Sequence, residues 1–232
     1  MRKRDSAKLK LENEYQSVIS TFTRLGRDRD AGAAEKELAL LLAGGVTPSI
    51  FNGQDLTGWT GLPSFWRVEE RQIVGTTRPR EIPQTNYFFT DLEYGDFEIG
   101  FKVRLVGADA DSGFMFRGKV VDAKTCDMVG PQANLMHGGW CDMYMQGSKH
   151  VQKRSKTLKK VDQTKISPNS GDEAFNDVFV RCVGKNLTVK FNGTEVIDGV
   201  FSAIPEKGVI GFQLWPGGPY EIYLKDIVFK SL

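Results

Sequence analysis

Histidine, cysteine and net charge are all scarce in this chain of 232 residues, and each scarcity excludes a class of protein. The two histidines, His137 and His150, are too few for a zinc site built mainly from imidazoles. Three cysteines without Cys-x-x-Cys spacing fit a reduced protein with buried thiols better than a disulfide framework. A net charge of +2 gives no overall attraction to nucleic acid or to an acidic membrane.

Long apolar runs are missing as well. The basic start, residues 1–5, is followed by charged residues where a signal peptide would have its apolar centre. The run from Leu38 to Ala43 is far too short to cross a bilayer. We therefore expect no signal peptide, no membrane span and a cytoplasmic location for the chain as given.

The composition changes sharply near residue 45. Residues 1–45 contain 9 basic and 7 acidic residues but no Pro, Cys or Trp, whereas the other 187 residues hold all nine Pro and all four Trp. This shift predicts a boundary near Gly44 and Gly45. It separates an N-terminal helical segment, residues 1–45, from a second domain, residues 46–232.

The first segment has helical periodicity. Asp30 can cap a second helix that ends at Gly44-Gly45. Two interpretations stay open: a helical hairpin or arm that packs on the domain or on another subunit as a homo-oligomer contact, or a frayed extension. The apolar positions are Leu11, Tyr15, Val18, Phe22 and Leu25 at heptad spacing, and Ala33, Ala34, Leu38, Leu41 and Leu42 in the second helix.

The remainder shows the alternation of β-strands. Apolar residues at every second position from Phe97 to Leu105 predict a half-buried antiparallel strand. Asn192-Gly193 between two alternating runs predicts a tight hairpin, and a slip of phase near Asp226 predicts a bulge. About a dozen strands follow, which is typical of an all-β sandwich or jelly roll. The shorter strands are Phe65–Val68, Gln72–Gly75, Tyr87–Phe89 and Met143–Met145.

The stretch from Gly147 to Ala174 lacks periodicity and is strongly basic. One interpretation is a solvated loop or charged hairpin, and the other is a basic rim over a binding face for an anionic ligand or partner. Nucleic acid is not expected, because no aromatic residue between His150 and Phe175 is available to stack on bases. Its cations are Lys149, Lys153, Arg154, Lys156, Lys159, Lys160 and Lys165.

Several short blocks, in order and at consistent spacing, resemble the 3-keto-disaccharide hydrolase family over residues 49–232. Residues 51–59 (FNGQDLTGW) resemble its opening signature, and residues 65–75 its W-x-V-x-x-G-x-L-x-G hairpin. Residues 111–117 (DSGFMFR) resemble a block that usually begins Asn-Ser-Gly, and residues 130–134 (GPQAN) resemble its Gly-Tyr-Gln-Ala-Asp stretch. Residues 208–219 resemble its G-x-I-x-L-Q-x-H-x-G-G-P stretch.

The resemblance implies a concanavalin A-like jelly roll of two antiparallel sheets whose concave face binds sugar. It also implies cleavage of 3-keto-glycosides. A ketone at C3 acidifies the C2 proton; a base removes that proton, the glycosidic oxygen leaves by elimination, and water adds back. Such a site needs a base and a stabiliser for the enolate oxygen, either a divalent metal or an arginine.

Three residues are the candidates for catalysis. His137 lies in a glycine-rich turn and is a candidate base, because imidazole is a common general base in enzymes. Asp142 is a candidate base or metal ligand, and Arg117 can hold an enolate or a sugar hydroxyl. Each also has a structural interpretation, as a loop histidine, a surface carboxylate or an ion-paired arginine. The expected substrate-binding residues are Gln132, Asn134, Trp140, Tyr144, Gln213, Trp215 and Asp111.

Three of these positions depart from the family pattern. Asp111 replaces the usual Asn, Asn134 replaces the usual acid, and Trp215 stands where the family has His. Asn134 cannot act as a carboxylate base, and Trp215 can stack on a pyranose ring or pack in the core, but it cannot shuttle a proton. A non-catalytic carbohydrate-binding or scaffold role is therefore the alternative to a glycoside-cleaving enzyme.

Overall fold

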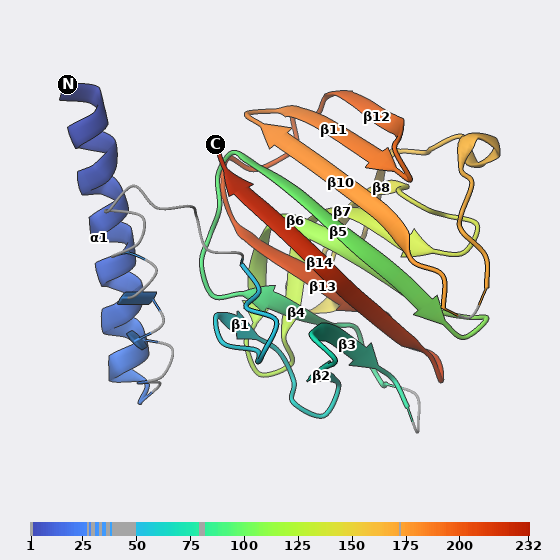
Figure 1. Ribbon diagram of the computed structural model, residues 1–232, viewed down its shortest axis with the longest axis horizontal. Helices are drawn as coiled ribbons and strands as arrows, with labels where there is room; N and C mark the ends of the chain where they lie inside the picture. The colour runs from blue at the N-terminus through green and yellow to red at the C-terminus, as the bar shows by residue number, and fades with distance from the viewer. Residues whose placement is uncertain are drawn as a thin grey trace.

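Two seven-stranded sheets pack face to face in the computed structural model, which describes residues 2–26, 28, 31–32, 34–35, 38, 50–78, 82–171 and 173–232 (Figure 1). Every strand pair is antiparallel. The all-β sandwich of two antiparallel sheets predicted from the alternating residues is therefore confirmed.

Both sheets mix strands from distant parts of the chain. Sheet A has the order β1 (Trp59–Thr60), β4 (Asn86–Thr90), β13 (Val209–Leu214), β6 (Asp111–Asp122), β7 (Asp127–Met136), β8 (Met143–Gln146) and β9 (Lys156–Lys159). Sheet B has the order β12 (Thr194–Val200), β11 (Asn186–Phe191), β10 (Asn176–Val183), β5 (Phe97–Val106), β14 (Glu221–Ser231), β3 (Gln72–Thr76) and β2 (Trp66–Glu69). The basic stretch after β8 holds only β9 and two short 3₁₀ turns, η1 (Lys149–Val151) and η2 (Gln163–Lys165).

The inner faces of the sheets form one aromatic core. Phe97, Ile99 and Phe101 of β5 are buried in it, and Phe114 of β6 lies 5.5 Å from Phe212 of β13 between ring centroids. Because successive side chains in a strand point to opposite faces, the residues between these project from the outer faces. The outer face of sheet A is therefore made by the odd-numbered residues of β13 and of β6 as far as Met115, where the pairing with β7 shifts, and by the even-numbered residues of β7 and β8.

The predicted turn and bulge are both present. Asn192 and Gly193 have φ of 46° and 80°, the left-handed pair that a two-residue hairpin turn requires between β11 and β12. In β14 the pairing with β5 shifts between Lys225 and Val228, and Asp226 there has φ of 52°. Cys126, Cys141 and Cys182 are buried and unpaired, as expected for a reduced protein.

The N-terminal helix α1 (Arg2–Arg24) buries one stripe, but the stripe differs from the expected heptad at its end. Tyr15 and Phe22 are buried and Val18 is partly buried, whereas Leu25 follows the helix and is 63% exposed, so its assignment to the stripe was wrong. The stripe packs on Ala31, Ala34 and Leu38, and on Leu92 between β4 and β5. The side chain of Leu11 and residues Asp30, Ala33, Leu41, Leu42, Gly44 and Gly45 lie outside the described part of the chain.

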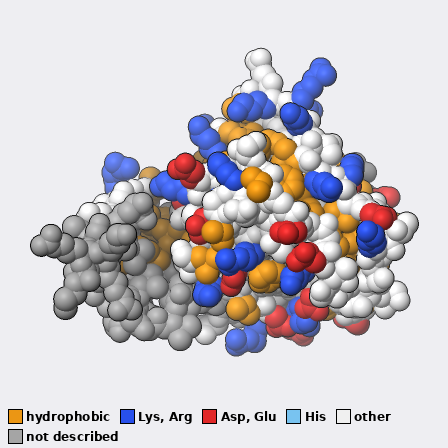
Figure 2. Space-filling model, turned by 90° about the horizontal axis from the view of Figure 1, so that it is seen from above, with side chains coloured by type: hydrophobic (Ala, Val, Ile, Leu, Met, Phe, Trp, Pro, Cys, Tyr) orange, Lys and Arg blue, Asp and Glu red, His pale blue; other side chains and the backbone are white. Residues whose placement is uncertain are grey.

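The boundary between the helical segment, 1–45, and the domain, 46–232, stays a prediction. No helix within the described residues is both long and apolar enough to cross a membrane. Lysine and arginine side chains lie interspersed with carboxylates over the face seen in Figure 2, as the near-neutral charge requires.

Candidate functional site on the outer face of sheet A

A closed ring of hydrogen bonds lies at the centre of the outer face of sheet A. The Tyr87 hydroxyl donates to Oε1 of Gln132 at 3.1 Å, Nε2 of Gln132 donates to Oε1 of Gln213 at 2.9 Å, and Nε2 of Gln213 donates to the Tyr87 oxygen at 2.8 Å. All three residues are at most 1% exposed. Burial raises the pKa of Tyr87 well above its usual value, so the ring contains a neutral phenol.

A glycine makes room for this ring. Gly113 pairs with Asn134 across β6 and β7, and a Cβ atom added to it would lie 2.7 Å from Cγ of Gln132 and closer still to its amide. The Gln132 side chain therefore lies across the position where another residue would have its Cβ. Predicted as substrate-binding, Gln132 and Gln213 do share one face, but they bond to each other and to Tyr87, a residue that the sequence analysis did not single out.

The tip of the β6–β7 hairpin folds back over the outer face and covers the ring. Cys126 and Met128 from the tip pack in one apolar cluster with Tyr87 and Met115 of the sheet. The Tyr87 backbone N–H donates to the Cys126 carbonyl oxygen at 2.8 Å. The polar ring is therefore a buried floor, and a ligand must contact the residues around it.

Asp111 is the half-buried carboxylate beside this floor. It starts β6, and its outer-face parity matches that of Gly113. Its backbone oxygen accepts hydrogen bonds from the Tyr220 hydroxyl at 2.7 Å and from the Trp215 N–H at 3.3 Å. Burial raises the pKa of the Asp111 carboxyl to about 6. A carboxylate tuned in this way can accept a proton near neutral pH.

Two other predicted residues adjoin Asp111. Trp215 follows β13 with outer-face parity and is 39% exposed, so its indole is available to a ligand. Asn134 is partly exposed; its Oδ1 accepts from Gln132 at 3.3 Å, and its Nδ2 makes only a weak contact with the Met136 sulfur at 3.3 Å. Asn134 is the diagonal neighbour of Asp111, which pairs with Met136, so their Cα atoms are roughly 7–8 Å apart.

Asp142 and Tyr144 form a separate cluster with Lys160. The Asp142 carboxylate is buried; it accepts from Lys160 Nζ at 2.6 Å and from the Val161 N–H at 2.9 Å. Lys160 also bonds to the Tyr144 hydroxyl and lies over its ring, 4.9 Å from the centroid. The hydrogen bonds to Asp142 and Tyr144 raise the pKa of Lys160. Asp142 is thus occupied by a lysine that the sequence analysis noted only as part of the basic stretch.

Arg117 lies on the inner side of the fold instead of at the site. Its side chain is fully buried, and all five of its N–H groups have protein acceptors. No donor remains for an enolate or a sugar hydroxyl, so the structural interpretation of this residue applies. The acceptors are the carbonyl oxygens of Gly95, Cys182, Gly184 and Pro205 and the Asp96 carboxylate.

His137 and Trp140 lie beyond the end of β7. His137 is exposed in the turn, with its ring 6.1 Å from that of Trp140. Trp140 is 2% exposed and packs on Phe191 in the core, 5.0 Å between centroids, so it offers no surface to a sugar. Its expected role in substrate binding is therefore not supported by its position.

A divalent metal has no evident binding site among the described residues. No three of their His, Cys, Asp or Glu side chains converge as ligands. Asp142, a candidate base or metal ligand, is bonded to Lys160 and to a backbone N–H. The residues present do not fit a metal held by protein ligands alone, and no catalytic step is assigned to one.

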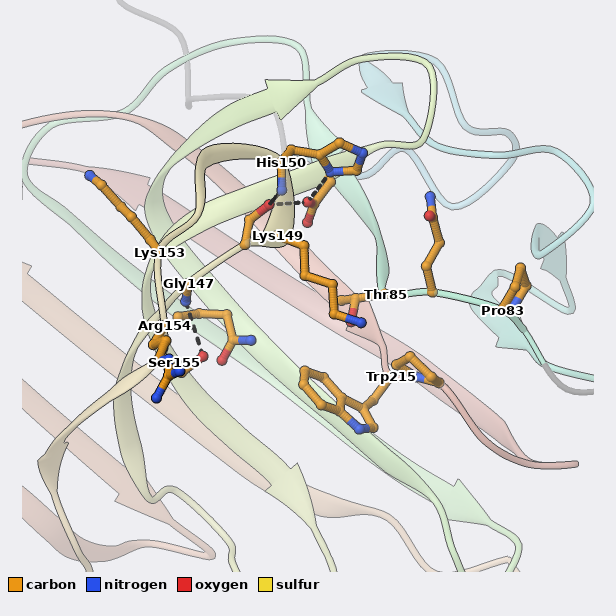
Figure 3. A pocket seen from close by; sticks show the side chains of 14 residues that line it. Pro83, Thr85, Gly147, Lys149, His150, Lys153, Arg154, Ser155 and Trp215 are labelled. Atoms are coloured by element: carbon orange, nitrogen blue, oxygen red, sulfur yellow. Dashed lines mark hydrogen bonds and ion pairs between the residues drawn. The ribbon is translucent and has the colours of Figure 1, made fainter.

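A pocket of about 350 Å³ has Trp215 in its lining and falls within the size range of small-molecule sites (Figure 3). Its walls come from residues 83–85 just before β4, Asp127 at the start of β7, the end of β8 with the loop after it, and Trp215 with Pro216. Trp215 therefore lines the pocket and is bonded through its backbone to Asp111.

Residues 47–230 match the family model of the 3-keto-alpha-glucoside-1,2-lyase-like domain, and the chain belongs to that family. A search of curated proteins found no match.

Solved structures share the fold at low sequence identity. A protein of Parabacteroides distasonis, provisionally described as a glycosyl hydrolase, is 20% identical with a TM-score of 0.57, over 79% of this chain and 92% of that one. The carbohydrate-binding module CBM66 of Bacillus subtilis is 12% identical with a TM-score of 0.55, over 75% and 96%. The Emp47p carbohydrate recognition domain is 15% identical with a TM-score of 0.51, over 79% and 93%.

Proposed function

We propose that this protein cleaves 3-keto-glycosides by elimination across C1 and C2, with Asp111 as the general base. The Asp111 carboxylate takes the C2 proton, and the electron pair moves onto the C3 carbonyl oxygen as an enolate. The enolate then collapses, the C1–O glycosidic bond breaks, and the leaving oxygen is protonated. Water adds to the resulting double bond, which completes a net hydrolysis.

One observation carries this proposal: a half-buried carboxyl with a pKa of about 6 on the outer face of sheet A. A base is most effective when its pKa lies near the working pH. The resemblance places an Asn at position 111 and an acid at position 134, and this chain has the reverse. Because Asp111 and Asn134 are diagonal neighbours on one face, the exchange keeps one carboxyl and one amide at the same place.

The surrounding residues have supporting roles in this proposal. Asn134 Nδ2 donates to the enolate oxygen, and Trp215 stacks on the pyranose ring. The ring of Tyr87, Gln132 and Gln213 holds the floor rigid, since each member fixes the orientation of the next. His137, in the turn directly after the residue that pairs with Asp111, is the candidate acid for the leaving oxygen.

The test is an assay of 3-keto-trehalose and a 3-keto-glucoside by mass spectrometry, with C2 deuterium exchange measured in D₂O. We expect Asp111→Asn to lower turnover by roughly 10²–10⁴-fold, the usual contribution of a general base. Asp109→Asn, which changes an exposed carboxylate two residues away, is the matched control and should leave turnover intact. The double variant D111N/N134D should recover part of the activity, because it returns the carboxyl to the adjacent strand. Absence of both product and C2 exchange in the wild type would overturn the proposal.

Carbohydrate binding without catalysis is the second candidate. It is favoured by the exposed Trp215 indole beside a sheet face whose amides already bond to one another. In that case sugars should bind the wild type and Asp111→Asn equally, and Trp215→Ala should abolish binding. Calorimetric titration with a sugar panel measures the binding, and the turnover assay distinguishes the two candidates, since a base is needed only for turnover.

A further inference from the structure

The pocket lined by Trp215 carries an excess of positive charge. Lys149, Lys153, Arg154 and His150 line it, and Asp127 is the one acid among its lining residues. Figure 3 shows Lys149 extending from the loop toward Trp215 on the opposite wall. Lys149 thus faces an exposed indole across the cavity, whereas Lys153 extends away from it in this view.

The loop that carries these cations, residues 147–155, is fixed by its own backbone. Lys153 N–H donates to the Ser148 carbonyl oxygen at 3.0 Å, and Gly147 N–H donates to Ser155 Oγ at 3.1 Å. A Cβ atom on Gly147 would collide with the backbone of Lys153 and Arg154, so the two sides of the loop are in close contact. The cations are therefore presented by a closed turn, which distinguishes this segment from a solvated loop.

The same loop is anchored to the β6–β7 hairpin tip. Ser148 Oγ donates to the Asp127 carboxylate, which also accepts from His150 Nδ1 at 2.7 Å; His150 Nε2 lies 3.3 Å from Asp122 Oδ2. Asp127 is thus engaged by His150 and Ser148. Lys149, Lys153 and Arg154 make no ion pair with any carboxylate of the described residues, so three cationic groups remain for a ligand.

We infer that this pocket binds the oxyanion group of an acidic sugar, a carboxylate, phosphate or sulfate, while Trp215 stacks on the sugar ring. The loop backbone is ordered before a ligand binds, and an anion near several cations gains from each of them. The inference rests on the carbohydrate-binding part of the proposed function. It adds that the substrate carries a negatively charged group, and that this group lies in the pocket lined by Trp215.

The experiment compares the binding of glucuronic acid, glucose 6-phosphate, glucose 6-sulfate and glucose by calorimetric titration of the full chain. We expect at least one acidic sugar to bind about tenfold more tightly than glucose, because three exposed ion pairs each contribute modestly. The preference should decrease at high salt, which screens exposed charges. The sugar with the tightest binding identifies which oxyanion the pocket accepts.

Two triple variants test the location of the site. The K149Q/K153Q/R154Q variant removes three charges from the pocket lining and should lose the preference, whereas K156Q/K159Q/K165Q removes three exposed charges from outside it and should keep the preference. Circular dichroism checks that both fold. Equal binding of glucose and all acidic sugars, or an equal loss in both triples, overturns the inference.

The outcomes also separate this inference from the catalytic proposal. Turnover of neutral 3-keto-trehalose without any preference for acidic sugars overturns the anion pocket alone. Binding of acidic sugars without C2 exchange supports the pocket and overturns the catalytic proposal alone.

Discussion

Replacing Gly113 with Ala tests whether the buried ring organises the site. The new methyl group would lie 2.7 Å from Cγ of Gln132 and closer still to its amide, so Gln132 must leave its place. Its departure breaks the bonds to Tyr87 and Gln213, both of which are at most 1% exposed. The Tyr87 hydroxyl proton and Gln213 Oε1 would then lack their partners, while the bond from Gln213 Nε2 to the Tyr87 oxygen can remain.

The expected loss of stability combines two effects. Overpacking costs about 1–3 kcal/mol. Buried polar groups left without partners cost about 1–3 kcal/mol each, although relaxation recovers part of this. We therefore expect the free energy of unfolding to fall by about 2–5 kcal/mol, and Tm by roughly 5–15 °C for a chain of this size.

The assay is thermal and urea unfolding, with Gly100→Ala as the matched control. Gly100 lies in β5 with ordinary backbone and nothing within 4 Å of an added Cβ atom, so this variant should be neutral. The cost of Gly113→Ala should also shrink in a Gln132→Ala background, because the group it displaces is then absent. If Gly113→Ala and Gly100→Ala unfold alike, the close approach of Gln132 to Gly113 does not constrain the site.

Three further predictions follow from buried or paired charges. Arg117→Lys should lower the free energy of unfolding by about 3–5 kcal/mol, measured by denaturant titration. The molecules that remain folded should keep the wild-type turnover. A loss of turnover without a loss of stability would restore a catalytic role for Arg117. Because burial raises the pKa of Asp111 to about 6, its ionised form destabilises the fold at neutral pH. Asp111→Asn should therefore be about 1–2 kcal/mol more stable than wild type at pH 7, allowing for solvent screening. The difference in the free energy of unfolding should vanish as the pH falls toward 4, where Asp111 is protonated in the folded and unfolded states. A difference that stays constant across this range would contradict the assignment. The hydrogen bond to Asp127, with the charges of Asp127 and Asp122, raises the pKa of His150. The protonated His150 therefore anchors the basic loop fully below its unfolded-state pKa of 6.5, and this anchoring is lost as the pH rises through the raised pKa of the folded state. Binding of acidic sugars should weaken over that rise in wild type but not in His150→Gln, and parallel pH profiles of the two proteins would show that His150 does not anchor the loop.

The strands could be predicted from the sequence because their signals are local. Alternation from Phe97 to Leu105, the Asn192-Gly193 turn and the slip at Asp226 each depend on a few adjacent residues. The exposure of Leu25 was missed because a heptad pattern does not reveal where a helix ends. The order of strands in each sheet also depends on contacts between distant residues that the pattern does not contain.

The site could be predicted only in part, for the same reason. Strand parity correctly placed Gln132, Asn134 and Gln213 on one face, and the same parity could have included Tyr87. The bonds of Arg117 to three separate backbone segments could not be predicted, because each acceptor is more than 20 residues away. Nor could the pairing of Asp142 with Lys160, since the lysine belonged to a stretch without periodicity.

The folded-back hairpin tip also protects an edge of sheet A. β1 pairs with only two residues of β4, so the rest of that strand would present free backbone groups to other chains. The Cys126 carbonyl oxygen accepts a hydrogen bond from the backbone N–H of Tyr87. This N–H is therefore not available to pair with a strand of another chain, the first step of edge-to-edge aggregation. Shortening this hairpin to open the site would therefore also expose the strand edge of β4 to pairing with other chains. The need to avoid aggregation thus limits how far the site can be widened.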